Sequence, residues 1–224
     1  MSRPDRKDSL RTVVFDLDGT LIDSEELILA SFRHTMRTHL GAAPPDESWR
    51  RTIGTPLAVQ VRDFARSDAE AESMIRTYTD HNLSEHDRLV RPFEGIREAL
   101  EELRNRGRTL AIATSKRRVA TEMGLAACGL PIDWFASIVT ADDVTRFKPD
   151  AEPVLRALAE SGEERSGRAV YVGDSVHDMR SGRAAGVSTA AVLWGPNDRA
   201  DLAPESPDLW IERPGEIPGM LGAG

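Results

Sequence analysis

Short apolar runs alternate with amphipathic stretches along this chain of 224 residues. The apolar runs predict buried strands at Thr12–Phe15, Thr109–Ala113, Ser137–Thr140, Ala169–Val172 and Thr189–Leu193. Between them, hydrophobic residues recur at helical spacing and predict helices at Gly95–Arg106, Arg117–Cys128, Ala151–Glu160 and Met179–Ala185. Repeated strand–helix units predict an α/β fold with a doubly wound parallel sheet that is covered on both faces.

The alternation is interrupted between residues 24 and 91, where no strand pattern occurs. A helix is expected over Ser24–Leu40, with Asp23 or Ser24 capping its start, and helical pieces follow at Pro56–Ala65 and Ala69–His81. We therefore expect a discontinuous core of residues 10–23 and 92–224, with an all-helical domain of residues 24–91 inserted into it. Leu21–Ser24 and Pro92 would form the hinge between the two parts.

Polar residues follow several of the predicted strands at the point where each strand ends. Asp16 and Asp18 come directly after the first strand, Thr114 follows the second, and Asp174 follows the fourth. Because the carboxyl ends of parallel strands meet at one edge of the sheet, these residues are expected to converge there. Lys148 and Asp178 complete the set that we expect at this edge.

Four carboxylates in one pocket repel one another unless a cation lies among them, and a hard divalent ion such as Mg²⁺ prefers oxygen ligands. Lys148 would add a fixed positive charge and Thr114 a hydroxyl donor, and both suit a phosphate group. Asp16 and Asp18 beside the metal would offer a nucleophile and a proton carrier. The set therefore indicates hydrolysis of a phosphate monoester.

Composition narrows the classes of partner. A net charge of −8 and a pI near 5.2 argue against nucleic acid, and no apolar run is long enough to span a bilayer. The polar start, residues 1–9, lacks the apolar centre of a signal peptide. The single cysteine, Cys128, rules out an intrachain disulfide and fits a reducing cytoplasm. We expect a cytoplasmic monomer or homodimer that acts on a small phosphorylated metabolite.

Four motifs occur in order: DLDGT at Asp16–Thr20, ATSK at Ala113–Lys116, FKPD at Phe147–Asp150 and GDSVHD at Gly173–Asp178. With them, the chain resembles the haloacid dehalogenase superfamily, specifically its phosphoglycolate-phosphatase-like branch, from Thr12 to about Trp194. The resemblance implies a Rossmann-like core and a helical cap of the C1 type. Residues 24–91 would be this cap, which closes over the site and selects the substrate. No usable motif follows Gly195.

The resemblance also implies a role for each matching residue. Asp16 would attack phosphorus and form an aspartyl-phosphate, and Asp18 would protonate the leaving oxygen and then activate water. Thr114 would bind a phosphoryl oxygen, and Lys148 would neutralise charge on the phosphate and on Asp16. Mg²⁺ would be held by Asp16, the backbone carbonyl of Asp18 and Asp174. Asp178 would act through water or by orienting other groups.

Several sites remain open at the sequence level. Ser115 and Arg51 are candidates for substrate contact, but Lys116–Arg118 equally fits a solvated helix start. The segment Ile53–Leu57 fits both a substrate-facing cap loop and a plain turn between helices.

Alternative functions also remain open. They are a phosphomutase of the β-phosphoglucomutase type, a 2-haloacid dehalogenase, and a phosphoacceptor domain of the response-receiver type. The presence of Asp18 argues against the dehalogenase, and the helical insertion argues against the receiver. The identity of the phosphorylated substrate is not encoded in any motif.

Overall fold

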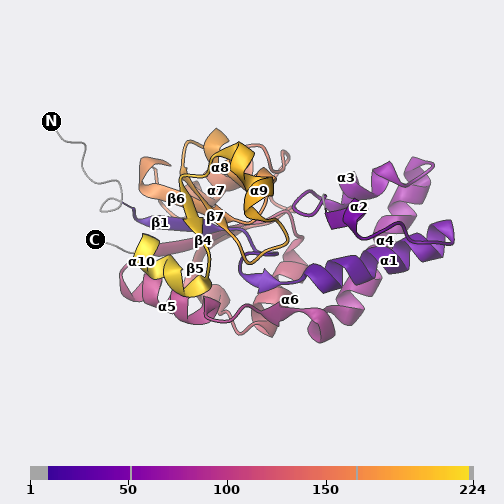
Figure 1. Ribbon diagram of the computed structural model, residues 1–224, viewed down its shortest axis with the longest axis horizontal. Coiled ribbons are helices and arrows are strands. Elements are labelled where there is room, and N and C mark those ends of the chain that lie inside the picture. The colour runs from indigo at the N-terminus through magenta and orange to yellow at the C-terminus, as the bar shows by residue number, and fades with distance from the viewer. Residues whose placement is uncertain (1–9, 51, 165, 222–224) are drawn as a thin grey trace.

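The computed structural model describes residues 10–50, 52–164 and 166–221, so the predicted leader and Arg51 lie outside the described residues. Its centre is a sheet of parallel strands in the order β5-β4-β1-β6-β7-β8 (Figure 1). These strands are β1 (Thr12–Phe15), β4 (Thr109–Ala113), β5 (Phe135–Val139), β6 (Ala169–Gly173), β7 (Ser188–Val192) and β8 (Leu209–Ile211). The predicted doubly wound α/β fold is confirmed.

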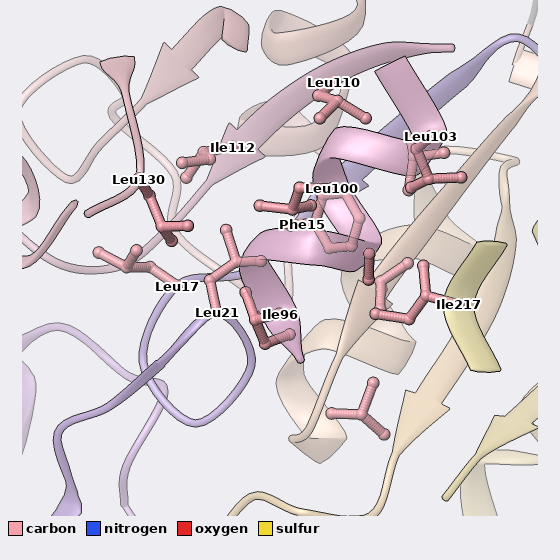
Figure 2. Close-up of a cluster of buried hydrophobic side chains, with 14 of the residues drawn as sticks. Phe15, Leu17, Leu21, Ile96, Leu100, Leu103, Leu110, Ile112, Leu130 and Ile217 are labelled. Atoms are coloured by element: carbon pink, nitrogen blue, oxygen red, sulfur yellow. The ribbon is translucent and has the colours of Figure 1, made fainter. Parts of the chain in front are cut away.

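Side chains of β1 show how the sheet is buried on both faces. Val13 and Phe15 belong to one hydrophobic cluster and Val14 to another, because successive side chains of a strand point to opposite faces. Figure 2 shows the first cluster, in which α5 packs its Ile96, Leu100 and Leu103 against the sheet. Both faces of the sheet are therefore shielded from water at β1, as expected for a central strand of a parallel sheet.

The helices of the core up to α8 follow the strands in the predicted alternation, and α9 and α10 lie in the C-terminal part for which no helix is predicted. They are α5 (Ile96–Asn105), α6 (Arg118–Ala127), α7 (Glu152–Glu160), α8 (Val176–Ala184), α9 (Arg199–Leu202) and α10 (Ile217–Leu221). Short 3-10 turns occur at η3 (Ile132–Trp134), η4 (Ser166–Arg168), η5 (Ala203–Glu205) and η6 (Pro214–Glu216). Helices α7 and α8 cover one face, whereas α5 and α10 pack together on the other (Figure 1).

The insertion between β1 and β4 is helical, as predicted. It contains α1 (Glu25–Leu40), α2 (Glu47–Arg50), α3 (Leu57–Gln60), η2 (Val61–Asp63) and α4 (Asp68–Leu89). These helices have their own hydrophobic cluster, in which the rings of Phe32 and Trp49 stack with centroids 4.1 Å apart. Helix α4 extends eight residues beyond the predicted end at His81. We call residues 24–91 the cap, although this boundary itself stays a prediction.

The chain enters and leaves the insertion side by side. β2 (Ile22–Asp23) pairs antiparallel with β3 (Arg91–Pro92), directly at the predicted hinge. Strands of two residues leave no periodic signal, so this pairing could not be read from the sequence. Among the described helices, none has the length and apolar character needed to span a bilayer.

Candidate active site

A tight turn after β1 carries the first two carboxylates. The Asp16 N–H still donates to the Val172 carbonyl at 2.9 Å, which continues the sheet pairing for one residue. The Leu17 carbonyl then accepts bonds from the amides of Thr20, Leu21 and Ile22. Gly19 has a φ of +78°, which favours glycine. The turn thus holds Asp16 and Asp18 at the carboxyl edge of the sheet.

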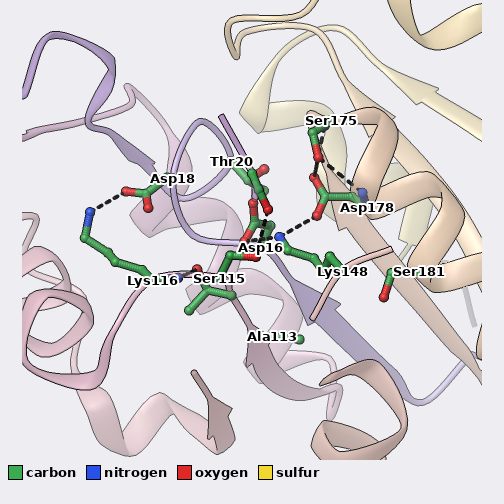
Figure 3. A network of polar contacts seen from close by, with 12 residues as sticks. Asp16, Asp18, Thr20, Ala113, Ser115, Lys116, Lys148, Ser175, Asp178 and Ser181 are labelled. Atoms are coloured by element: carbon green, nitrogen blue, oxygen red, sulfur yellow. Dashed lines mark hydrogen bonds and ion pairs between the residues drawn. The ribbon is translucent and has the colours of Figure 1, made fainter. Parts of the chain in front are cut away.

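Lys148 lies between two buried carboxylates. Its Nζ is 2.8 Å from Asp16 Oδ1 and 2.7 Å from Asp178 Oδ1, and each of the three residues is no more than 3% exposed (Figure 3). Burial opposes the charge of Lys148, yet the two carboxylates outweigh burial and raise its pKa. The lysine is therefore a fixed positive charge inside the site.

Asp174 joins Asp16 and Asp178 in a cluster of acidic groups. One oxygen atom from each residue lies within 4.8 Å of the other two. Burial, followed by the charge of Asp178, raises the pKa of Asp16 to about 7, although Lys148 acts in the opposite direction. Burial and the charges of Asp178 and Asp16 raise the pKa of Asp174 well above its ordinary value. Three crowded carboxylates with one lysine retain an excess of negative charge, which a bound cation would relieve.

Two local features fit a cation beside Asp16 and Asp174. Despite its closeness to Lys148, Asp16 Oδ1 is buried without a well-angled hydrogen bond from any described residue. Space around Asp174 is kept by glycines, since a Cβ on Gly19 would lie 2.7 Å from Asp174 Oδ2 and one on Gly195 would lie 2.5 Å from Asp174 Cβ. The donor set and this cradle can hold a metal ion with oxygen ligands.

Both oxygens of Asp178 already have protein partners. Its Oδ1 accepts from Lys148 and from the Tyr171 hydroxyl at 3.0 Å, and its Oδ2 accepts from the amide and hydroxyl of Ser175. Burial would raise the pKa of Asp178, but Lys148 and Ser175 together lower it. These contacts fit an orienting role better than direct coordination of a metal, in line with the predicted role for Asp178.

The carboxylate of Asp18 lies outside the acidic cluster. Asp18 Oδ1 accepts from Lys116 Nζ at 2.8 Å and from Ser24 Oγ at 2.5 Å (Figure 3). Ser24 does precede α1, as predicted, but its side chain makes no capping bond because it is turned to Asp18. Lys116 is 9% exposed in its side chain, so it is not part of a solvated helix start.

A cavity of about 330 Å³ opens over Asp16 and Asp18, between the core and the cap. The core side of its wall includes Thr114, Ser115, Lys116 and Lys148. Thr114 is buried, and its hydroxyl accepts a bond from the Lys116 amide at 3.1 Å. The Ser115 hydroxyl donates to the Gly54 carbonyl of the cap at 2.7 Å, so the cap is closed on the core at this point. The segment 53–57 therefore lines the site.

Several supporting residues make contacts at the site that no signal in the sequence predicts. The Thr20 hydroxyl donates to Asp174 Oδ1 at 2.9 Å, and Trp194 Nε1 donates to the Thr20 carbonyl at 3.0 Å. Thr20 belongs to the DLDGT motif, but its partner is 154 positions away. Tyr171 lies in β6, and Trp194 and Gly195 follow the end of β7.

Comparison with known proteins agrees with this geometry. A model of the family described as haloacid dehalogenase-like hydrolase matches residues 13–192. The chain belongs to this family. It is 40% identical over 215 residues to the pyrophosphatase PpaX of Oceanobacillus iheyensis, covering 96% of this chain and 98% of that protein. Identity to the PpaX of Bacillus pumilus is 38% over 216 residues, with the same coverage.

Solved structures show the same fold. A haloacid dehalogenase-like hydrolase of Bacteroides fragilis superposes with a TM-score of 0.86 at 27% identity, covering 93% of this chain and 99% of that one. A phosphoglycolate-phosphatase-like protein of Lactobacillus plantarum superposes with a TM-score of 0.84 at 25% identity, covering 95% and 99%. The resemblance inferred from the four motifs is confirmed, and the chain is a hydrolase of the phosphatase branch of this family.

Proposed function

We propose that this chain is a Mg²⁺-dependent phosphatase that hydrolyses a small phosphorylated metabolite through an aspartyl-phosphate on Asp16. The observation that carries the proposal is the separation of the two neighbouring carboxylates. Asp16 lies in the acidic cluster beside Lys148, whereas Asp18 lies outside that cluster and pairs with Lys116. One group is thus suited to attack and the other to proton transfer.

In the first step, a carboxylate oxygen of Asp16 attacks phosphorus while the bond from phosphorus to the leaving oxygen breaks. Asp18 gives its proton to that oxygen, so the leaving group departs as an alcohol. In the second step, Asp18 takes a proton from water, which attacks the aspartyl-phosphate and releases phosphate and Asp16. Lys148 and Thr114 would stabilise charge on the phosphoryl oxygens throughout.

Asp16, Asp174 and the Asp18 carbonyl would hold Mg²⁺, with Asp178 orienting Lys148. When bound, the ion would neutralise charge on the phosphate and on the nucleophile. Both donors found on Asp18 among the described residues reach Oδ1, which leaves Oδ2 for proton exchange with the substrate.

Release of inorganic phosphate from a panel of metabolite esters, with and without Mg²⁺, tests the proposal. Asp16→Asn is expected to abolish turnover, because an amide cannot replace the nucleophile. Asp133→Asn, at an exposed aspartate away from the cavity, is the matched control and should retain full activity. Retained activity in Asp16→Asn would disprove the nucleophile, and an isomerised sugar phosphate in place of free phosphate would indicate a mutase.

Pyrophosphate hydrolysis is the second candidate function, favoured by the name of the relatives at 38–40% identity. It uses the same nucleophile and acid but a leaving group that is itself a phosphate. The two candidates therefore differ in what the cavity beyond Asp16 must accommodate.

A further inference from the structure

The cavity over Asp16 is much larger than the phosphoryl group that reacts there. Its volume of about 330 Å³ falls within the range of about 300–1,000 Å³ that is typical of small-molecule sites. In the proposed reaction the phosphoryl group lies at the core end, where Asp16 and Lys148 line the cavity. The rest of the volume lies under the cap, so its lining must match the leaving group of the substrate.

The cap side of this cavity is neutral. Its apolar lining includes Ile53, Leu57 and Ile75, and its polar lining includes Gln60, Tyr78 and Asn82. None of the described cap residues that line the cavity carries a charge. This wall differs from the core end, where the described cations of the cavity are located.

Those cations are already paired with carboxylates. Lys148 pairs with Asp16 and Asp178, and Lys116 pairs with Asp18 at 2.8 Å. The third cation, Arg117, pairs with Asp142, also at 2.8 Å, but its side chain is 71% exposed, so solvent already screens its charge. A second anionic group on the substrate would have to compete with Asp16, Asp178 or Asp142 for a cation, or rely on Lys116 alone while Asp18 carries its proton, because no cation of the described cap wall faces it.

Two of the neutral polar side chains of the cap wall already make hydrogen bonds within the cap. The Gln60 amide donates to the Thr55 carbonyl, and the Asn82 amide donates to Ser31 Oγ at 3.3 Å. Burial, together with the charge of Asp18, raises the pKa of Tyr78 above its ordinary range, so its hydroxyl stays a neutral donor. Tyr78 can donate a hydrogen bond to a hydroxyl or ether oxygen of the substrate, but it cannot neutralise a charge.

Burying an ionised group against such a wall is costly because it loses hydration and gains no counter-charge. We propose that the preferred substrates are phosphate monoesters of neutral alcohols with an apolar body, and that Leu57 and Ile75 determine this specificity. Pyrophosphate and phosphoglycolate, whose leaving groups are anionic, would be poor substrates. This inference rests on the phosphatase function proposed above.

A pair of esters of the same shape isolates the charge. Isopentyl phosphate and 3-phosphooxypropanoate differ only in whether the alcohol ends in a dimethyl-substituted carbon or in a carboxylate. With the full chain at saturating Mg²⁺, kcat/KM for isopentyl phosphate should exceed that for 3-phosphooxypropanoate and for pyrophosphate by about tenfold or more. A smaller ratio, or a preference for pyrophosphate, overturns the inference while leaving the phosphatase function intact. Absence of phosphate release from all three and from the whole panel of metabolite esters would refute the phosphatase function instead.

Cap variants test where the selectivity arises. Leu57→Lys places a cation in the wall and should shift the ratio toward the anionic esters by about tenfold. Val59→Lys is the matched control, because Val59 lies on the same helix α3 but is 54% exposed and does not line the cavity. An unchanged ratio in a folded Leu57→Lys would remove Leu57 from the proposal. If the native enzyme prefers anionic esters and Arg51→Ala removes that preference, Arg51 supplies the missing charge and the inference is wrong.

Discussion

Lys148 Nζ lies 2.8 Å from Asp16 Oδ1 and 2.7 Å from Asp178 Oδ1, and all three side chains are buried. The lysine thus joins the proposed nucleophile to the orienting carboxylate. Three carboxylates crowd around the single positive charge of Lys148, and this charge has two functions. It is available to phosphoryl oxygens during the reaction, and it lowers the pKa of Asp178 and opposes the rise in the pKa of Asp16.

Lys148→Ala should lower kcat/KM by about 10²–10³-fold, since it removes a preorganised charge from the reacting phosphate. It should also destabilise the metal-free protein by about 3–5 kcal/mol, because Asp178 and Asp16 lose their buried partner. Steady-state kinetics and thermal unfolding with and without Mg²⁺ measure the two effects. Arg146→Ala is the control, as Arg146 is charged, close in sequence and exposed. Equal kinetics in both variants would contradict the role of Lys148.

Gly195→Ala should weaken the metal site, although Gly195 belongs to none of the four motifs. The added Cβ would lie 2.5 Å from Asp174 Cβ and 2.7 Å from the Gly19 carbonyl, so Asp174 must move. We expect about tenfold weaker Mg²⁺ activation and a loss of about 1–3 kcal/mol in stability. Gly215→Ala, where a Cβ meets no atom within 4 Å, should change neither quantity. Mg²⁺ titration of activity separates the two variants.

Ser115→Ala should loosen the closed cap. The variant removes the hydrogen bond from Ser115 Oγ to the Gly54 carbonyl, which is worth about 0.5–1.5 kcal/mol. The closed population should fall accordingly, and kcat/KM should drop about two- to tenfold. Ser161→Ala removes a hydrogen bond of similar length at the C-terminal end of α7, to the Ala157 carbonyl, and should have no kinetic effect. Identical kcat/KM in the two variants would show that this contact does not limit closure.

Cys128 should be unreactive in the folded protein. Burial, followed by the charge of Asp23, raises the pKa of its thiol to about 11. A raised pKa means that the thiol is protonated at neutral pH, and at pH 8 only about one molecule in a thousand carries the reactive thiolate. Alkylation by iodoacetamide should therefore be at least about 100-fold slower than for a free thiol, and should accelerate as pH rises toward 11. Denatured protein should react at the ordinary rate, and equal rates in both states would refute the shift.

The sequence predicted the parts of the fold that repeat a local pattern. β1, β4, β6 and β7 were placed to within a residue, because each is a short apolar run buried on both faces. β8 is not predicted, because Leu209–Ile211 is only three residues long. It forms a strand by pairing in parallel with β7. The length of α4 was underestimated because its second half mixes polar and apolar residues while packing against α6.

The candidate site was predictable where chemistry and motif coincide. Asp16, Lys148 and Asp174 were expected together, and the structure brings them together. Thr20, Tyr171 and Trp194 were not found, because their partners are set by strands that are distant in sequence. For Ser24 the local sequence predicts a helix cap, but its side chain makes no capping hydrogen bond and donates to Asp18 instead.

The pairing of β2 with β3 has a consequence for how this protein can be altered. Since Ile22–Asp23 and Arg91–Pro92 run side by side, the two ends of the inserted helices are already joined at their base. The chain therefore crosses between the catalytic sheet and the insertion at one paired stem, and the remaining described contacts between the two parts, such as Ser115 with Gly54 and α4 with α6, are made by side chains and surfaces outside it. A different helical unit grafted onto this stem would exchange the substrate chamber while Asp16, Lys148 and Asp174 keep their positions, provided that the graft retains Ser24 beside Asp18.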